Sequence, residues 1–246
     1  MKLKLVSCEV LFREMCHVVA RSPHQVDVEF LPKGLHDLGG RKMSVKLQEI
    51  VDRTPQGVYD AILFGYGLCG NGLDGLTARH TPLVLPRAHD CIALLMGSRE
   101  RYQQYFDSNP GTFYRSTGWL ERGKGLQQLV HQTIGLEESL DALIRKYGDD
   151  NGRYLYDEIM RYRTRYEKLT FIETGLETDG NFIAEAAAEA SERGWAFERM
   201  SGDLRWLHNL VYGEWSEAEF VIARPGDRIA ASYDGGIVSI QSGSVA

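Results

Sequence analysis

The chain has 246 residues, and its 34 Asp and Glu outnumber its 28 Lys and Arg, which gives a formal net charge of −6. This acidic balance gives no electrostatic reason to expect binding to nucleic acid or to an anionic membrane. No stretch approaches the roughly 20 apolar residues that span a bilayer, and charged residues interrupt the N-terminal segment too early for a signal peptide. We therefore expect a cytoplasmic protein, in which the four cysteines serve metal binding, catalysis or packing rather than disulfides.

The first half of the chain alternates between strand-like and helix-like segments. Short apolar runs that end at turn residues predict strands at 3–7, 26–31, 59–64 and 82–85. The intervening patterns predict helices at 12–20, from a cap at Ser44 through Val51, and from 94 to 105.

The second half begins with a charged segment whose apolar stripe predicts helices, and then alternates again. Strands are predicted at 169–172, 196–200 and 220–223, and helices at 181–193 and 204–212. The turns at 173–175 and 224–227 are expected to face the same sheet edge as the cysteines described below. The Gly- and Ser-rich tail after Asp234 is expected to be mobile.

This alternation predicts an α/β fold with Rossmann-like parallel sheets and right-handed crossovers. We expect two lobes with a helical insert: an N-terminal α/β lobe at 1–125, a helical connector at 126–167 and a C-terminal α/β lobe at 168–246. A single long sheet is the alternative that the pattern leaves open.

Three cysteines follow predicted strands that are far apart in the sequence. Cys8 comes after the first strand, Cys69 lies in the loop after 59–64, and Cys91 follows 82–85, two residues beyond His89. Because the carboxyl ends of parallel strands lie along one edge of a sheet, these side chains are expected to converge there. Cys16 lies within the first predicted helix and is expected to pack in the core.

Thiolates are preferred ligands of zinc, copper(I) and iron–sulfur clusters. Cys8, Cys69, Cys91 and His89 supply the four ligands of a closed zinc site or the three of an open one. The three cysteines alone match a [4Fe–4S] cluster with one iron left open to substrate. The structural alternative is that these cysteines pack in the core as small apolar residues.

A catalytic pair without metal is a further interpretation of the same residues. His89 would act as acid or base beside Asp90, with Cys69 or Cys91 as the nucleophile. Its weakness is geometric, because adjacent residues in a strand point to opposite faces.

The loop at 65–72 is rich in glycine and follows a buried strand. It has no Walker lysine and does not fit G-x-G-x-x-G. We interpret Tyr66, Gly67 and Gly70 as residues that let the backbone approach a bound ligand. Arg87 is expected to orient an anionic substrate, and His89 to bind the metal or to transfer protons.

Several segments resemble the DUF1638 family, an uncharacterised group. They are 59–70 (YDAILFGYGLCG), 82–92 (PLVLPRAHDCI), 95–102 (LMGSRERY), 110–114 (PGTFY) and 118–119 (GW). The resemblance implies an association with corrinoid-dependent methyl transfer, and hence a role in one-carbon or methylamine-type metabolism. The cobalamin-binding pattern D-x-H-x-x-G is absent, since His36 precedes Asp37.

Three functions stay open from the sequence. The first is a metal-dependent transferase or lyase that acts on a small anionic, methylated or thiol substrate. The second is a non-catalytic metal or cofactor carrier that serves a corrinoid or methyltransferase partner protein. The third is a metal-free enzyme that depends on Cys and His.

Overall fold

The computed structural model describes residues 1–123, 140–163, 166–178, 180–232 and 236–242. These residues form two compact units. The first unit comprises 1–104, 174–176 and 201–246, and the second comprises 105–173 and 177–200. The three-part division expected from the sequence stays a prediction, and the first part of its connector at 126–167 lies outside the described residues.

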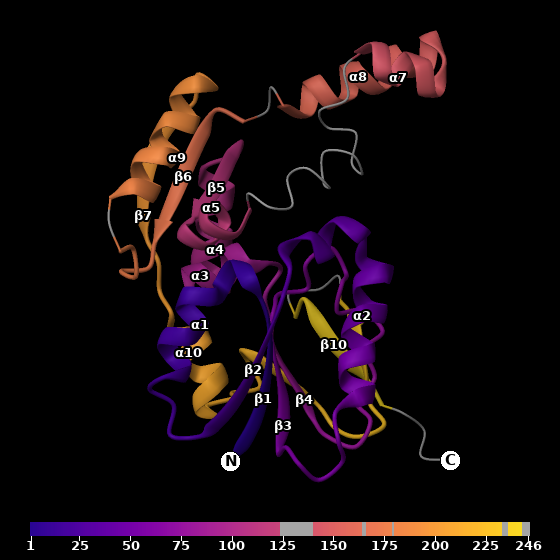
Figure 1. Ribbon diagram of the computed structural model, residues 1–246, viewed down its shortest axis with the longest axis vertical. Coiled ribbons are helices and arrows are strands. Elements are labelled where there is room, and N and C mark those ends of the chain that lie inside the picture. The colour runs from indigo at the N-terminus through magenta and orange to yellow at the C-terminus, as the bar shows by residue number, and fades with distance from the viewer. Residues whose placement is uncertain (124–139, 164–165, 179, 233–235, 243–246) are drawn as a thin grey trace. The chain divides into compact units, whose positions relative to one another are not determined.

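The first unit is built on a five-stranded sheet with the order β2-β1-β3-β4-β8 (Figure 1). Neighbouring strands from β2 to β4 are parallel, and β8 is antiparallel to β4. The expected α/β fold with a mostly parallel sheet is confirmed. The strands are β1 (Lys2–Cys8), β2 (Gln25–Leu31), β3 (Ala61–Gly65), β4 (Leu83–Pro86) and β8 (Phe220–Ala223).

Helices cover both faces of this sheet. The helices α1 (Phe12–Val19) and α10 (Arg205–Tyr212) pack on one face, and α2 (Gly40–Arg53) lies on the other (Figure 1). Every residue of β3 and β4 is buried, as expected for central strands covered on both sides. The shorter elements are η1 (Glu9–Leu11), η2 (Lys33–Leu38), α3 (Cys91–Met96) and α4 (Arg99–Ser108).

Two predicted helices differ from the observed ones. Helix α2 begins at Gly40, so Ser44 is not its cap, and the Ser44 hydroxyl donates to the Asp74 carbonyl at 2.6 Å. The segment predicted as one helix from 94 to 105 is interrupted at Gly97, whose φ of 70° closes α3 in the left-handed region. Glycine ends a helix here because it carries no penalty in that conformation.

The C-terminal part of the chain also departs from expectation. Because β8 is antiparallel, it ends at the edge opposite the carboxyl ends of β1 to β4, so the expectation for the turn at 224–227 is wrong. Antiparallel edge strands on parallel sheets are common. A hairpin follows, formed by β9 (Arg228–Ala231) and β10 (Val238–Gln241). The expectation of a mobile tail is therefore wrong for 238–241, where Val238 is buried.

The second unit contains a three-stranded sheet with the order β5-β6-β7. The strand β5 was not predicted, and it pairs in parallel with β6. None of the described helices is long and apolar enough to cross a membrane. The elements of this unit are β5 (Thr112–Ser116), β6 (Lys168–Glu173), β7 (Ala196–Ser201), α5 (Thr117–Gly123), α7 (Leu140–Tyr147), α8 (Asp149–Arg163) and α9 (Asn181–Glu192).

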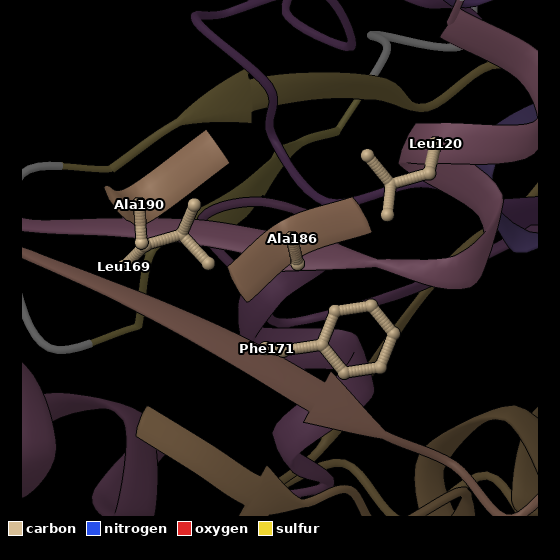
Figure 2. Packing of buried hydrophobic residues seen from close by; sticks show 5 residues of the cluster. All are labelled: Leu120, Leu169, Phe171, Ala186 and Ala190. Atoms are coloured by element: carbon tan, nitrogen blue, oxygen red, sulfur yellow. The ribbon is translucent and has the colours of Figure 1, made fainter. Parts of the chain in front are cut away.

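A small core fixes α9 and α5 to this sheet (Figure 2). Leu169 and Phe171 alternate along β6 and are fully buried. Ala186 and Ala190 lie one turn apart on α9, and their small side chains let the helix approach β6 closely. Leu120 of α5 completes the cluster, which is shown by itself in Figure 2.

Phe171→Ala is expected to destabilise this unit by about 3–5 kcal/mol, because it removes a fully buried ring and leaves a cavity. The measurement is urea unfolding followed by circular dichroism. Phe106→Ala is the matched control, since Phe106 is 51% exposed and should cost far less. Equal losses for the two variants would contradict the assignment of Phe171 to the core.

Candidate functional site

The connections of the main sheet reverse direction between β1 and β3. The chain passes from β1 outward to β2 and then crosses back to β3 on the other side of β1. Ligands of open α/β sheets bind outside the carboxyl ends of the strands at such a point. Cys8 is the last residue of β1, and Tyr66 directly follows β3, whose final residue Gly65 pairs with Ser7.

The pairing of β3 with β4 continues into the loops beyond both strands. The backbone N–H groups of Leu68 and Cys69 donate to the carbonyls of Ala88 and His89, each at 2.8 Å. Gly67 permits this approach, because a Cβ there would lie 2.5 Å from the backbone nitrogen of Asp90. The two loops are therefore held together, with Cys69 beside the start of α3.

The loop then turns through three consecutive residues with positive φ: Cys69 (48°), Gly70 (62°) and Asn71 (66°). Such angles are uncommon for residues other than glycine, and strain of this kind clusters at functional sites. The Gly70 carbonyl faces Gly40 at the start of α2, where a Cβ on Gly40 would come within 2.5 Å of it. The turn is thus packed against a helix.

Cys8 lies close enough to Cys69 for its charge to raise the pKa of the Cys69 thiol, and both thiols act in the same way on Tyr66. Burial raises the pKa of Cys8 to about 12, and a hydrogen bond from the Val10 backbone offsets this only in part. Burial also raises the pKa of Cys69, with the Asp90 carboxylate and Cys8 adding to the effect. Both thiols are therefore neutral near pH 7.

Cys91 joins the same region through its backbone. Backbone hydrogen bonds from Gly67 and Cys91 reach the Cys69 sulfur, and they lower the pKa of that thiol against the stronger effect of burial. Cys91 is the first residue of α3 and is buried. The three cysteines predicted from the sequence thus gather at one edge.

Tyr66 lies against these thiols and is 1% exposed. Its hydroxyl is buried, and none of the described residues forms a hydrogen bond with it. The pKa of this phenol is raised far above its ordinary value, first by burial and then by Cys8 and Cys69. We call the side chains of Cys8, Tyr66 and Cys69 the thiol cluster. A buried hydroxyl without a partner costs free energy, which a bound group that accepts a hydrogen bond from it would relieve.

His36 is a site residue that sequence reasoning missed. Its ring centroid lies 5.9 Å from that of Tyr66. Burial, with a smaller effect from the nearby Lys33, lowers the pKa of His36 to about 4, so the imidazole is neutral at pH 7 and able to bind a metal. The signal was present, because η2 with His36 follows the carboxyl end of β2 just as the cysteines follow β1, β3 and β4.

Other predicted site residues point elsewhere. His89 is exposed, with its ring centroid 6.3 Å from that of Tyr102. Asp90 caps α3 by accepting from the Ala93 N–H at 3.0 Å and also accepts from the Tyr102 hydroxyl, so both of its oxygens already have donors other than His89. Cys16, expected in the core, is exposed, and that expectation is wrong.

Arg87 does not enter the thiol cluster. Its guanidinium donates to the backbone carbonyls of Glu217, Gly236 and Val238. Among the described residues, no group of three or more His, Cys, Asp or Glu side chains is arranged closely enough to hold a metal ion. The cluster thus offers two neutral thiols, which are soft donors, beside a buried phenol, and it is not a completed coordination shell.

Fold and site together define an α/β protein with buried thiols at the switch point of a mostly parallel sheet. The chain belongs to the family described as "Protein of unknown function (DUF1638)", whose match covers residues 30–211. This confirms the resemblance seen in the sequence. The matched region includes His36, Tyr66, Cys69 and Cys91 but begins after Cys8. Comparison with curated proteins and with solved structures gives no match.

The raised thiol pKa values predict the order of alkylation. At about pH 8, iodoacetamide should modify the exposed Cys16 first and leave Cys8 and Cys69 largely unmodified, because only thiolates react. Mass spectrometry of tryptic peptides measures this order. Modification of Cys8 as fast as that of Cys16 would show that its thiol is neither buried nor neutral.

The same shift predicts how stability depends on pH. The pKa of Cys8 rises on folding from 9.0 to about 12, so folding holds its proton more tightly. The contribution of the neutral thiol to stability is complete below pH 9.0 and is lost as the pH rises towards 12. Between pH 9.0 and 12, the free energy of unfolding should fall less for Cys8→Ser than for the unsubstituted protein. Urea unfolding at a series of pH values measures this difference.

Proposed function

We propose that the chain is a metal-binding protein in which the thiols of Cys8 and Cys69 hold one soft ion, with zinc the best candidate. The carrying observation is the Tyr66 hydroxyl, which is buried without a partner beside both thiols. Two thiolates balance the charge of one divalent ion, which removes the desolvation cost that keeps these thiols neutral. Cys91 and His36 are the candidates for further ligands.

The donor set suits zinc in its chemistry, since thiolate and imidazole are its usual ligands. A [4Fe–4S] cluster bound by Cys8, Cys69 and Cys91 is the alternative. The close packing around Tyr66 and Cys8, which are 1% and 2% exposed, favours a single ion over a bulky cluster. We assign the imidazole ligand to His36 rather than to His89, because His36 contacts Tyr66 and His89 is exposed.

A metal-free nucleophile is the less favoured function. Nucleophilic cysteines have lowered pKa values in electropositive surroundings. Cys8 and Cys69 show the opposite shift, and the carboxylate of Asp90 raises the pKa of Cys69 further. The pairing of His89 with Asp90 that such an enzyme needs also competes with the capping of α3 by Asp90.

As a metalloenzyme, the protein would be a transferase or lyase acting on a small anionic, methylated or thiol substrate. A bound zinc ion supplies a Lewis acid and lowers the pKa of a water or thiol. Tyr66 would donate a hydrogen bond to the bound substrate. The family resemblance adds one-carbon or methylamine-type metabolism in the cytoplasm, with a corrinoid or methyltransferase partner.

The carrier function differs from the enzyme in one respect. If both Cys91 and His36 complete the coordination, four protein ligands close the site and leave no position for substrate. If only one of them binds, an open position remains for catalysis. The Rossmann-like character of the sheet and the two-lobe organisation are part of the same proposal, and they would place the site where related folds bind ligands.

Metal analysis of protein purified without oxygen tests the proposal. We expect about one zinc per chain, and Cys8→Ser and Cys69→Ser should each lower the content at least tenfold. Cys16→Ser is the matched control, because Cys16 is an exposed thiol of the same unit. About four iron and four sulfide ions per chain would show that the site holds an iron–sulfur cluster instead of zinc. A native protein that contains no metal and keeps its activity would refute the metal site.

Tyr66→Phe separates stability from function. In metal-free protein the variant should unfold at equal or higher urea concentration, by up to about 1–2 kcal/mol, because it removes a buried hydroxyl without a partner. In metal-loaded protein, Tyr66→Phe should weaken the binding of substrate, or of any other molecule bound to the ion, because the hydrogen bond from the Tyr66 hydroxyl is lost. Clear destabilisation of the metal-free protein would mean that the hydroxyl has a structural partner.

A further inference from the structure

A second site lies in the first unit, apart from the thiol cluster. A cleft of about 350 Å³ is lined by three arginines, Arg87, Arg99 and Arg205, and by Glu100, Glu219 and Trp206. We propose that this cleft, which we call the arginine cleft, binds a small molecule through a phosphate group. Its volume lies in the range of small-molecule sites.

Arg87 brings a positive charge that the protein does not neutralise. Its Nε and Nη1 atoms donate only to backbone carbonyls, those of Glu217, Gly236 and Val238. Within the described chain, no carboxylate forms an ion pair with it, and Nη2 is left without an acceptor. A partly buried guanidinium held by neutral carbonyls keeps its full charge and a fixed position, which is the arrangement that recognises an oxyanion.

Arg205 is fixed on the wall of the cleft by two different acceptors. Its Nη1 donates to Glu219 at 2.6 Å, and its Nη2 donates to the Gly97 carbonyl at 2.8 Å. The same Glu219 oxygen accepts from the Trp206 indole at 2.9 Å, so this carboxylate is shared between two donors. The Nε of Arg205 is left for a ligand.

Two helices begin at the cleft. Helix α4 begins at Arg99 and α10 begins at Arg205, so the amino ends of both helices lie at the cleft. Gly97 permits their approach, because a Cβ there would lie 2.7 Å from the side chain and the carbonyl of Asp203. The amino end of α10 already bonds an anion, because the Arg205 backbone N–H donates to the Asp203 carboxylate at 2.8 Å. Arg99 pairs with Glu100 and Arg205 with Glu219, so Arg87 supplies the charge that the carboxylates lining the cleft do not balance.

This arrangement favours phosphate over a single carboxylate. The three arginines come from separate segments of the chain, and all of them line the cleft. A tetrahedral dianion offers oxygens to several guanidinium groups at once, whereas a carboxylate offers two in one plane. The rest of the ligand would extend into the remaining volume of the cleft.

Calorimetric titration with inorganic phosphate, at an ionic strength held constant with chloride, tests the site. The full chain should bind phosphate, and Arg205→Gln should weaken binding roughly tenfold or more. Arg79→Gln is the matched control. Arg79 is 49% exposed and pairs with Asp52, much as Arg205 is 45% exposed and pairs with Glu219. Arg79→Gln should leave phosphate binding unchanged.

Glu219→Gln supplies a test in the opposite direction. It removes a competing charge but keeps an oxygen that can accept from Arg205 and Trp206, so phosphate should bind several-fold more tightly. No phosphate binding, equal losses in Arg205→Gln and Arg79→Gln, or tighter binding of acetate than of phosphate would overturn the proposal. Chelator-treated protein should bind phosphate equally well, so failure of the metal site leaves this result unaffected.

Discussion

The continuation of the β3–β4 pairing beyond the two strands is the interaction on which the site depends. The hydrogen bonds from Leu68 and Cys69 to the carbonyls of Ala88 and His89 hold two loops in contact that sequence alone leaves independent. They place Tyr66 and Cys69 beside Cys8 at the end of β1, and they set the position from which α3 begins. Without the close approach at Gly67, neither arrangement would form.

The thiol cluster lowers the free energy of unfolding of the protein. Cys8 is buried and Cys69 is half-buried, the pKa of each thiol is raised, and the Tyr66 hydroxyl has no hydrogen-bond partner among the described residues. Each unsatisfied buried group costs on the order of 1–3 kcal/mol. Replacement by apolar residues would relieve that cost, so the polar groups point to a role beyond folding.

The sequence predicted what depends on local pattern and on the geometry of parallel strands. Apolar runs located β1, β3 and β4, and the common direction of these strands brought Cys8, Cys69 and Cys91 to one edge. Direction failed for β8, because an edge strand can pair either way after the chain returns from another unit. His36 was missed because cysteine was used as the marker of the edge, whereas its own strand, β2, ends there too. The exposure of His89 depends on the loop conformation, which periodicity does not report.

The left-handed turn at Cys69 has an evolutionary consequence. Glycine or asparagine would adopt its φ of 48° with less strain than cysteine does, by roughly 1 kcal/mol. Selection for thermal robustness alone would therefore replace this residue, and each such replacement would remove the sulfur. Relatives that have lost the function of the thiol cluster should therefore carry glycine or asparagine at the position of Cys69.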